Sequence, residues 1–229
     1  MRPSRSQYPD IRLDSFSLLH DELQKSIRGG RLSLGEGVQN SPMTAVARVF
    51  VITGPSGVGK GTLIRGLMER LPALELSVSA TTRAARPGER DGVDYHFLGS
   101  EEFARRIERG DFVEHADYAG RRYGTLRSEL DARVGAGVPV VLEIEVQGAR
   151  QVRAAMPEAL QVFIAPPSLD ALRTRLIGRG TDDHDEVERR LRVAEHELQA
   201  QPEFAHVVVN DRLEDALERL TAIVAGELD

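Results

Sequence analysis

The sequence predicts an α/β fold built on a parallel sheet that helices cover. Short apolar, β-branched runs alternate along the chain with segments of helical periodicity, and strands separated by helices pair in parallel through right-handed crossovers. A glycine-rich turn follows the first run, and two carboxylates end the most apolar one. Ligands of such sheets bind beyond the carboxyl ends of the strands, so we expect these features to converge. The runs are residues 49–52, 76–79, 112–114, 138–145, 161–165 and 207–209.

Helical patterns fill the intervals between these runs and supply the crossovers that a parallel sheet needs. A Gly/Tyr-rich segment at residues 118–124 interrupts the alternation and predicts a turn. The helical segments are residues 63–68, 101–108 and 126–134, one that begins at Ser168, one that ends at Gln199, and an amphipathic one near the C-terminus.

Residues 1–42 differ from the rest of the chain. They mix arginine, serine, aspartate and glycine around one amphipathic candidate, Ser15 to Ile27. We expect a disordered or loosely docked extension, or a start codon chosen too far upstream, in preference to a regulatory arm. The folded domain is expected at residues 43–229.

Composition excludes several classes of function. The net charge of −6 argues against a nucleic-acid partner held by a global positive field. The absence of cysteine excludes disulfides, thiol catalysis and cysteine-ligated metal. No stretch approaches the length of a membrane-spanning helix, and the first residues lack the apolar core of a signal peptide. We therefore expect a cytoplasmic protein without a membrane partner.

The glycine-rich turn has the pattern of a phosphate-binding P-loop between a strand and a helix. Its glycines let backbone N–H groups point at phosphate oxygens, and the helix N-terminus adds its dipole. Lys60 and Lys25 are the only lysines among 30 basic residues, which indicates a specific need for a compact ammonium group at Lys60. A turn that binds nothing is the structural alternative. The motif comprises Gly54, Pro55, Ser56, Gly57, Val58, Gly59, Lys60, Gly61 and Thr62.

A second segment, Ser79 to Glu89, has the composition of a phosphate site. Arg83 and Arg86 lie three residues apart, and two guanidinium forks with a tyrosine hydroxyl from Tyr95 suit a phosphate dianion. The alternative is a solvated loop whose arginines pair with its own acids, Glu89 and Asp91. A neighbouring P-loop favours the phosphate site, because a phosphotransferase needs an acceptor as well as a donor.

The complete series of motifs resembles the guanylate kinase family. Beside the P-loop it comprises S-x-T-T-R-x-x-R-x-G-E-x-x-G-x-D-Y, E-x-A-x-Y-x-G-x-x-Y-G-T, E-I-E-V-Q-G and G-R-G-T, in the order of the family. The resemblance runs from about Val49 to the C-terminus. It implies a P-loop core with a parallel sheet in three layers, a nucleoside-monophosphate-binding insert and a small lid. The core would be residues 43–81 and 127–229, the insert 82–126 and the lid 177–192.

The resemblance also implies a role for each matching residue. Guanine offers N1–H and N2–H₂ donors that a carboxylate accepts as a pair, whereas adenine has no such face, so a buried Glu114 would select GMP. A lone acid at this position would otherwise be a solvated loop residue. The implied GMP-binding residues are Ser79, Arg83, Arg86, Glu89, Tyr95, Glu114, Tyr123, Thr125, Glu143 and Glu145.

The implied donor site combines the P-loop with residues from the lid and the last strand. Arg179 and Asn210 join the P-loop in binding ATP. Gly61 stands where serine or threonine usually follows the P-loop lysine, so Mg²⁺ is expected on the phosphates, with Thr62 or Glu143 as candidate protein ligands and no dedicated protein site. The implied catalytic residues are Lys60, Arg83, Arg175, Arg179 and Arg190.

The implied activity is ATP-dependent phosphorylation of GMP, and also of dGMP, by direct in-line transfer with Mg²⁺. Two alternatives stay open. One is a P-loop kinase of the same fold that acts on another phosphorylated acceptor. The other is a catalytically inactive guanylate-kinase-like module that binds partners. Whether the protein is a monomer or a homo-oligomer is left undecided by the sequence.

Overall fold

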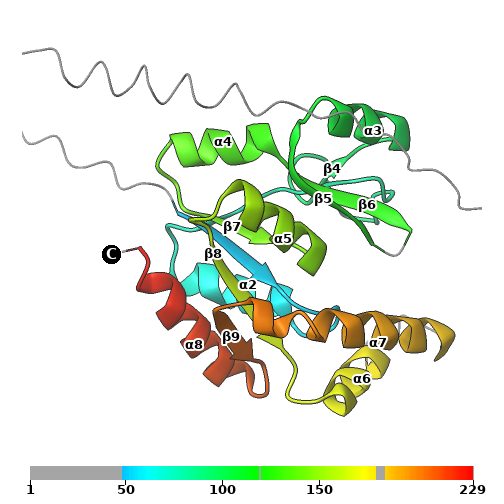
Figure 1. Cartoon of the computed structure of the whole chain (residues 1–229), viewed down its shortest axis with the longest axis vertical. Coiled ribbons are helices and arrows are strands. Elements are labelled where there is room, and N and C mark those ends of the chain that lie inside the picture. The colour runs from blue at the N-terminus through cyan, green and yellow to red at the C-terminus, as the bar shows by residue number, and fades with distance from the viewer. Residues whose placement is uncertain (1–47, 119, 179–183, 229) are drawn as a thin grey trace, which may run out of the picture. The chain divides into compact units, whose positions relative to one another are not determined.

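A parallel sheet forms the core of the part of the chain that the structure describes (Figure 1). The structure is a computed structural model of the 229-residue chain and describes residues 48–118, 120–178 and 184–228. The strands of this sheet are β1 (Val49–Thr53), β2 (Glu75–Leu76), β7 (Val140–Glu143), β8 (Leu160–Ala165) and β9 (His206–Val209). They follow the order β2-β7-β1-β8-β9, and every neighbouring pair is parallel. The predicted fold class is confirmed.

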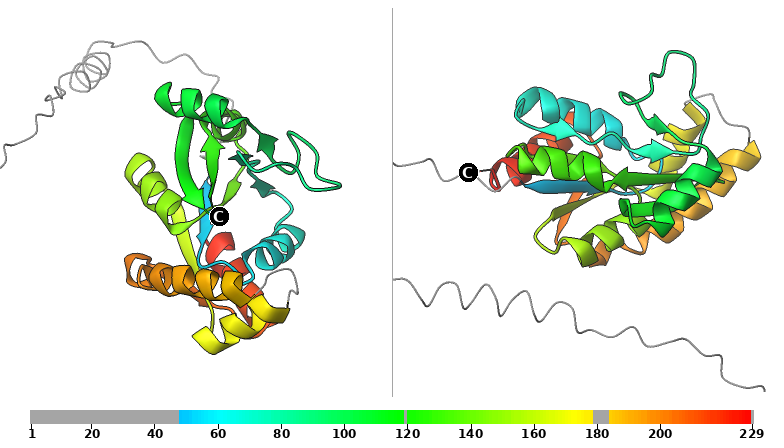
Figure 2. Two further views of the ribbon diagram at one scale, coloured as in Figure 1. Left: turned by 90° about the vertical axis from the view of Figure 1, so that its right-hand side faces the viewer. Right: turned by 90° about the horizontal axis from the view of Figure 1, so that it is seen from above.

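Helices connect these strands and cover both faces of the sheet (Figure 2). Side chains alternate across a strand, so β1 contributes to two cores. Phe50 and Ile52 pack on one face with α2 (Lys60–Arg70) and α8 (Leu213–Ala225), while Val49 and Val51 pack on the other face with α5 (Val146–Ala155). The described helices are α2 (Lys60–Arg70), α3 (Ser100–Glu108), α4 (Arg127–Gly135), α5 (Val146–Ala155), α6 (Leu169–Gly178), α7 (His184–Leu198) and α8 (Leu213–Ala225), with a 3₁₀ turn at Gln201–Glu203.

A second, four-stranded sheet lies between β2 and α4 in the chain. Its strands are β3 (Ala80–Thr81), β4 (His96–Phe97), β5 (Phe112–Tyr118) and β6 (Arg121–Leu126), in the order β4-β3-β6-β5. α3 covers this sheet through Phe103, whose ring stacks on that of Phe112 with 4.4 Å between the ring centres. The second sheet begins with β3 at Ala80, while the nucleotide-binding insert is predicted from residue 82.

Two local predictions are wrong. Residues 76–79 do not form one strand: β2 ends at Leu76, and the chain crosses to the second sheet, where β3 begins at Ala80. The Gly/Tyr-rich segment at 118–124 is largely strand and not turn, because β5 and β6 form an antiparallel hairpin. β6 also pairs with β3, where Ala80 faces Gly124, and this pairing with a distant strand holds the segment extended.

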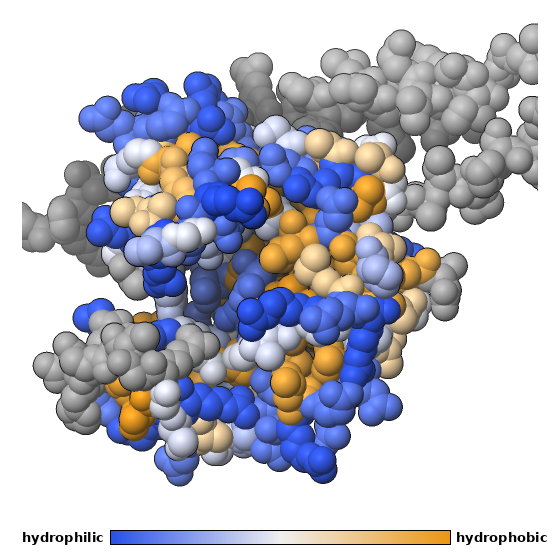
Figure 3. Space-filling view, turned by 180° about the vertical axis from the view of Figure 1, so that it is seen from behind, coloured by the Kyte–Doolittle hydropathy of each residue, from blue (hydrophilic) through white to orange (hydrophobic). Residues whose placement is uncertain are grey.

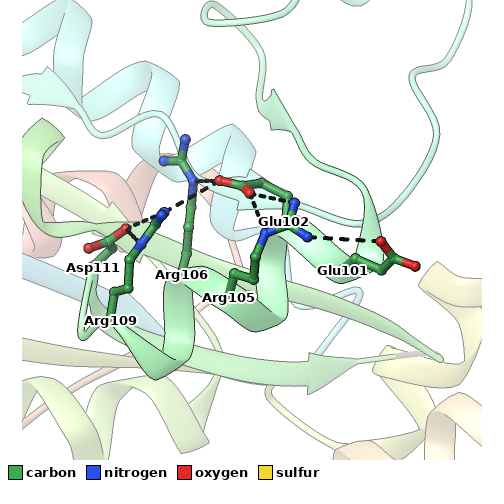
Figure 4. Close-up of polar contacts among 6 residues, drawn as sticks. All are labelled: Glu101, Glu102, Arg105, Arg106, Arg109 and Asp111. Carbon is green, nitrogen blue, oxygen red and sulfur yellow. Dashed lines mark hydrogen bonds and ion pairs between the residues drawn. The ribbon is translucent and has the colours of Figure 1, made fainter.

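The exposed face of α3 carries a network of ion pairs (Figure 4). Glu102 accepts hydrogen bonds from Arg105 and Arg106, and Arg109 contacts both Glu102 and Asp111. The hydrogen bonds from Arg106, and then those from Arg105, lower the pKa of Glu102 to about 2. The arginines of α3 are thus engaged at the surface with acids of the same region, and surface pairs of this kind stabilise a fold little.

Parts of the sequence-based prediction lie outside the described residues. They are the extension at residues 1–42 and, within the predicted lid, residues 179–183, which include Arg179. The described part of the lid region consists of the end of α6 and the first half of α7.

Gly54 fixes the start of the P-loop against β8, and its replacement tests this packing. Its φ is +138°, and a Cβ atom there would lie 2.2 Å from the carbonyl oxygen of Ile164. Gly88 has φ +91° and no atom within 4 Å of such a Cβ. Alanine at this position would therefore add backbone strain without a steric clash. We expect Gly88→Ala to lower the free energy of unfolding by about 1–3 kcal/mol and Gly54→Ala by about 1–3 kcal/mol more.

Urea unfolding of the two variants beside the wild type measures both values. Equal losses in the two alanine variants would contradict the close approach of Gly54 to β8.

Candidate active site

The P-loop joins β1 to α2 and curls around the ammonium group of Lys60. Gly54, Gly57 and Gly59 all have positive φ, at 138°, 84° and 99°, which lets the loop turn so tightly. Lys60 is 8% exposed, and its Nζ donates hydrogen bonds to the carbonyl oxygens of Gly54, at 2.6 Å, and Pro55, at 3.3 Å. The backbone carbonyl groups of the loop therefore hold the Lys60 ammonium group near the N-terminus of α2.

Side chains from distant elements hold the P-loop in place. Asn210, after β9, donates from Nδ2 to the carbonyl oxygen of Val58 at 2.8 Å. Arg175 on α6 donates to the same carbonyl at 3.3 Å and to that of Asn210 at 2.8 Å. Arg190 on α7 donates to Ser56 Oγ at 2.6 Å. These residues, predicted for ATP binding or catalysis, contact the loop itself.

A pocket of about 290 Å³ opens between the P-loop and the second sheet. Figure 3 shows the molecule from behind, with a hollow bordered by hydrophilic residues. Most predicted site residues from the P-loop, β5, β6 and the end of β7 meet there. The predicted residues that line the pocket are Pro55, Ser56, Gly57, Gly59, Lys60, Gly61, Ser79, Tyr95, Glu114, Tyr123, Glu143 and Glu145.

Other predicted residues lie behind this lining or at its edge. Thr125 is buried beneath Glu114, and Arg83 with Glu89 lies beside Tyr95. Arg86 and Thr62 are exposed. The pocket also contains residues to which the sequence analysis assigns no binding role, namely Leu76, Ser77, Asp94, Ala116, Tyr118, Gly124 and Ile144.

The carboxyl group of Glu114 is buried in the pocket wall. The residue is 3% exposed, and Thr125 Oγ1 donates to its Oε1 at 2.8 Å. A Cβ atom at Gly148, in the first turn of α5, would lie 2.2 Å from Glu114 Oε2, so only glycine leaves room for the carboxyl group there. Burial raises the pKa of Glu114 to about 7, with Glu145 adding to the rise and Thr125 opposing it.

Gln151 on α5 fixes β5 at the position next to Glu114. Its Nε2 donates to the carbonyl oxygen of His115 at 2.7 Å, and its Oε1 accepts from the N–H of His115 at 3.1 Å. The side-chain amide thus pairs with β5 as a neighbouring strand would. Sequence reasoning gives no sign of this contact, because the two residues lie 36 positions apart.

Arg83 is held by Glu89 through two parallel hydrogen bonds of 2.9 and 2.8 Å. Its guanidinium carbon also lies 5.2 Å from the centre of the Tyr95 ring. The Arg83 guanidinium, and then the backbone N–H of Arg86, hold the pKa of Glu89 below its usual value. The ion pair that the sequence offers as an alternative to phosphate binding is therefore present, and it fixes the direction in which Arg83 points.

Two carboxyl groups, those of Glu143 and Glu197, lie near Lys60. The Glu143 carboxylate oxygens lie 3.7 and 3.8 Å from the position that a Cβ would take at Gly61. The Glu143 side chain faces the pocket and is enclosed by the pocket walls. This desolvation raises the pKa of Glu143, and the positive charge of Lys60 opposes the rise. Glu197 on α7 lies near Glu145 and Lys60. Burial, followed by Glu145, raises the pKa of Glu197 to about 8.

Two further properties of the described residues bear on the class of protein. No group of three or more His, Asp or Glu side chains among them is arranged to hold a metal ion by itself. None of the described helices has the length and apolar character needed to cross a membrane.

The parallel sheet, the P-loop at its carboxyl edge and the facing pocket define the P-loop NTPase fold. The family model described as guanylate kinase matches residues 46–227, and the chain belongs to this family. The family assignment from sequence motifs is thereby confirmed.

Known proteins with similar sequences and structures agree with this assignment. The chain is 53% identical over 180 residues to a guanylate kinase of Synechococcus sp., covering 79% of this chain and 95% of the relative. It is 55% identical over 176 residues to that of Frankia casuarinae, covering 77% and 96%. The crystal structure of guanylate kinase from Anaplasma phagocytophilum superposes with a TM-score of 0.64 at 34% identity, over 80% of this chain and 87% of that one.

The buried carboxyl group of Glu114 predicts a pH-dependent stability. Its pKa is about 7 in the fold against an ordinary value of 4.5. The neutral form is therefore favoured by folding, and its contribution is complete below pH 4.5 and is lost as the pH rises through about 7. Relative to Glu114→Gln, the wild type should lose on the order of 3 kcal/mol of unfolding free energy between these limits.

Urea unfolding of wild type and Glu114→Gln at pH 4.5 and pH 8 gives this difference. A stability difference that does not change with pH would show that Glu114 is solvated and not buried.

Proposed function

We propose that this protein transfers the γ-phosphoryl group of ATP to GMP and to dGMP, forming ADP and the nucleoside diphosphate. The buried carboxyl group of Glu114 carries this proposal. It lies in a pocket that faces the P-loop, and as a carboxylate it can accept the paired N1–H and N2–H₂ donors of guanine. The relatives described as guanylate kinases support the same activity.

Guanine would bind between the second sheet and the first turn of α5. Glu114 would accept its paired donors, and Thr125, which donates to Glu114 Oε1, would fix the carboxyl group. Ser79 and Glu145, which line the same pocket, would contact the rest of the base edge. Adenine would leave the Glu114 carboxylate buried without a donor, which is a strong basis for rejection.

The phosphate of GMP would bind between the Arg83 segment and the tyrosines. Tyr95 and Tyr123 line the pocket and pack edge to face, with 6.2 Å between ring centres, and their hydroxyl groups would bind the phosphate together with the guanidinium of Arg83. Arg86 is exposed at the edge and would close on the same phosphate. Glu89 would act by orienting Arg83 and not by touching the phosphate, because carboxylate and phosphate repel each other.

ATP would place its phosphates on the P-loop, from Gly54 to Thr62. Backbone N–H groups of the loop would bind the β-phosphate, and Lys60 would move its hydrogen bonds from the loop carbonyls to the terminal phosphates. Asn210 supports the loop at Val58 and would lie near the adenine. Arg175, Arg179 and Arg190 would neutralise charge on the transferred group as the lid closes.

Transfer itself requires positioning and charge neutralisation. The acceptor atom is an oxygen of the GMP phosphate and already carries negative charge, so the reaction needs no general base. Arg83 on the acceptor side and Lys60 on the donor side approach the transferred group from opposite ends. A closed lid would keep water from taking the phosphoryl group in place of GMP.

Magnesium enters with ATP, and the residues fit an ion held mainly by substrate. Mg²⁺ takes oxygen ligands and is commonly bound by one or two carboxylates together with phosphates. Glu143 suits this role, because its carboxylate lies beside Gly61, where other P-loops carry a hydroxyl group. Thr62 is exposed on α2 and fits less well. When bound, the ion would neutralise charge on the phosphates during transfer.

The activity is tested by coupling ADP production to NADH oxidation with ATP and each of GMP, dGMP, AMP, UMP and CMP. We expect kcat/KM for GMP to exceed that for AMP by roughly 10⁴-fold, since adenine leaves Glu114 unpaired. Equal rates with GMP and AMP would favour a kinase for another acceptor. Tight GMP binding without turnover would favour an inactive binding module.

Arg83→Ala tests the division between the two nucleotide sites. Loss of a charge-assisted, bidentate contact should raise KM for GMP about 10- to 100-fold and leave KM for ATP nearly unchanged. Arg105→Ala on α3 removes an arginine that pairs only at the surface and serves as the matched control (Figure 4). A larger effect on ATP than on GMP would overturn the assignment of Arg83 to the acceptor site.

A further inference from the structure

β5 carries the carboxyl group of Glu114, although the second sheet supports this strand on one side alone. The strand lies at the edge of the sheet, and β6 is its neighbour there. The pairing with β6 is also irregular, because its register shifts between Phe112 and Glu114. A shift of this kind disrupts the ladder of hydrogen bonds and re-aims the side chains beside it. The position of Glu114 therefore depends on support from outside the sheet.

Gln151 supplies this support from α5, which packs beside β5 (Figure 1). Its Oε1 accepts from the backbone N–H of His115 at 3.1 Å, and its Nε2 donates to the carbonyl oxygen of His115 at 2.7 Å. These are the two backbone groups of an edge residue that a further strand would otherwise pair. The Gln151 amide thus takes the place of a strand at the residue directly after Glu114.

The side-chain amide of Gln151 fits this place in one orientation. Its Nε2 lies 2.7 Å from the carbonyl oxygen of His115 and 3.4 Å from that of Gln147, one turn back along α5. A turned amide would set its own oxygen against both carbonyl groups, and an amide oxygen cannot donate a hydrogen bond. α5 therefore holds the amide in a fixed direction toward β5.

The same face of α5 receives the Glu114 side chain. Gly148 lies three residues before Gln151, so the two positions share a face of the helix. A Cβ atom at Gly148 would lie 2.2 Å from Oε2 of Glu114, while Thr125 donates to Oε1 at 2.8 Å. Gly148 and Thr125 thus confine the carboxyl group, and Gln151 fixes the backbone from which it extends.

A fixed carboxyl group matters most for a ligand that uses both of its oxygens. GMP offers N1–H and N2–H₂ as paired donors, whereas inosine monophosphate (IMP) has N1–H but no amino group at C2. A small displacement of Glu114 would break the paired contact to guanine and leave a single hydrogen bond to hypoxanthine within reach. The preference for GMP over IMP is therefore the property most sensitive to the support of β5.

We infer that Gln151 is a positioning residue for guanine recognition, which fixes β5 beside Glu114 and thereby sets the preference for GMP over IMP. The inference rests on the proposed function. Gln151 is not among the residues that line the pocket, so it acts through Glu114 and not by touching the base.

Two substitutions of Gln151 in the full-length protein test this role, with ATP and either GMP or IMP in the coupled assay. Gln151→Ala should raise KM for GMP about 5- to 20-fold and lower the ratio of kcat/KM for GMP to that for IMP about 3- to 10-fold. KM for ATP should stay within about twofold of wild type, because the P-loop is untouched. Gln151→Met keeps the length of the side chain but cannot donate to His115, so the same changes are expected.

Gln161→Ala is the matched control. Gln161 is a buried glutamine of β8, and its Nε2 donates to the carbonyl oxygen of Ala149 on α5 at 2.9 Å. Its loss removes a hydrogen bond to the same helix without touching β5. We expect a lower melting temperature for this variant, with KM for GMP and the GMP-to-IMP ratio unchanged.

Thermal unfolding measured beside the kinetics separates positioning from a merely structural role. A lower melting temperature with an unaltered GMP-to-IMP ratio in Gln151→Ala overturns the inference, as does an equal change of the ratio in Gln161→Ala. If Gln151→Ala does not fold, Gln151→Met carries the test, and a wild-type ratio in Gln151→Met overturns the inference too.

The wild type decides the remaining points. Equal kcat/KM for GMP and IMP in the wild type would also overturn the inference, because Glu114 would then not read the paired donors. A wild type that does not phosphorylate GMP at all overturns the proposed function instead.

Discussion

The buried carboxyl group of Glu114 is the constraint on which the acceptor half of the molecule depends. Glu114 belongs to β5 of the second sheet, yet its Oε2 fills the space that Gly148 leaves in the first turn of α5. Thr125 supplies a hydrogen bond from β6, and Gln151 fixes the neighbouring backbone from α5. A carboxyl group is costly to bury, and its pKa of about 7 reflects that cost. A ligand that donates two hydrogen bonds to the Glu114 carboxylate would offset this cost of burial.

The donor half depends on how distant elements hold the P-loop. Gly54 approaches β8 too closely for a side chain, and Val58 accepts hydrogen bonds from Asn210 and Arg175. Arg190 on α7 donates a hydrogen bond to Ser56 Oγ. α7 begins within residues 177–192, where the lid is predicted.

Local patterns in the sequence predict the parallel sheet, the P-loop and the carboxylates at strand ends, because each depends on residues close together in the chain. The β5–β6 hairpin does not follow from local pattern, since its Gly/Tyr-rich segment is held extended by pairing with β3. Gly148 and Gln151 owe their roles to partners far away in sequence, namely Glu114 and His115. The motif series implies which residues bind nucleotide but not which residues hold them.

The most direct test of this account is the carboxyl pKa of Glu114, measured by ¹³C NMR with and without nucleotide. Without nucleotide the account predicts a pKa of about 7, because burial disfavours the charged form. Saturating GMP should lower this pKa strongly, since its N1–H and N2–H₂ groups stabilise the carboxylate, while AMP should not. A pKa of Glu114 that GMP leaves unchanged would contradict the account.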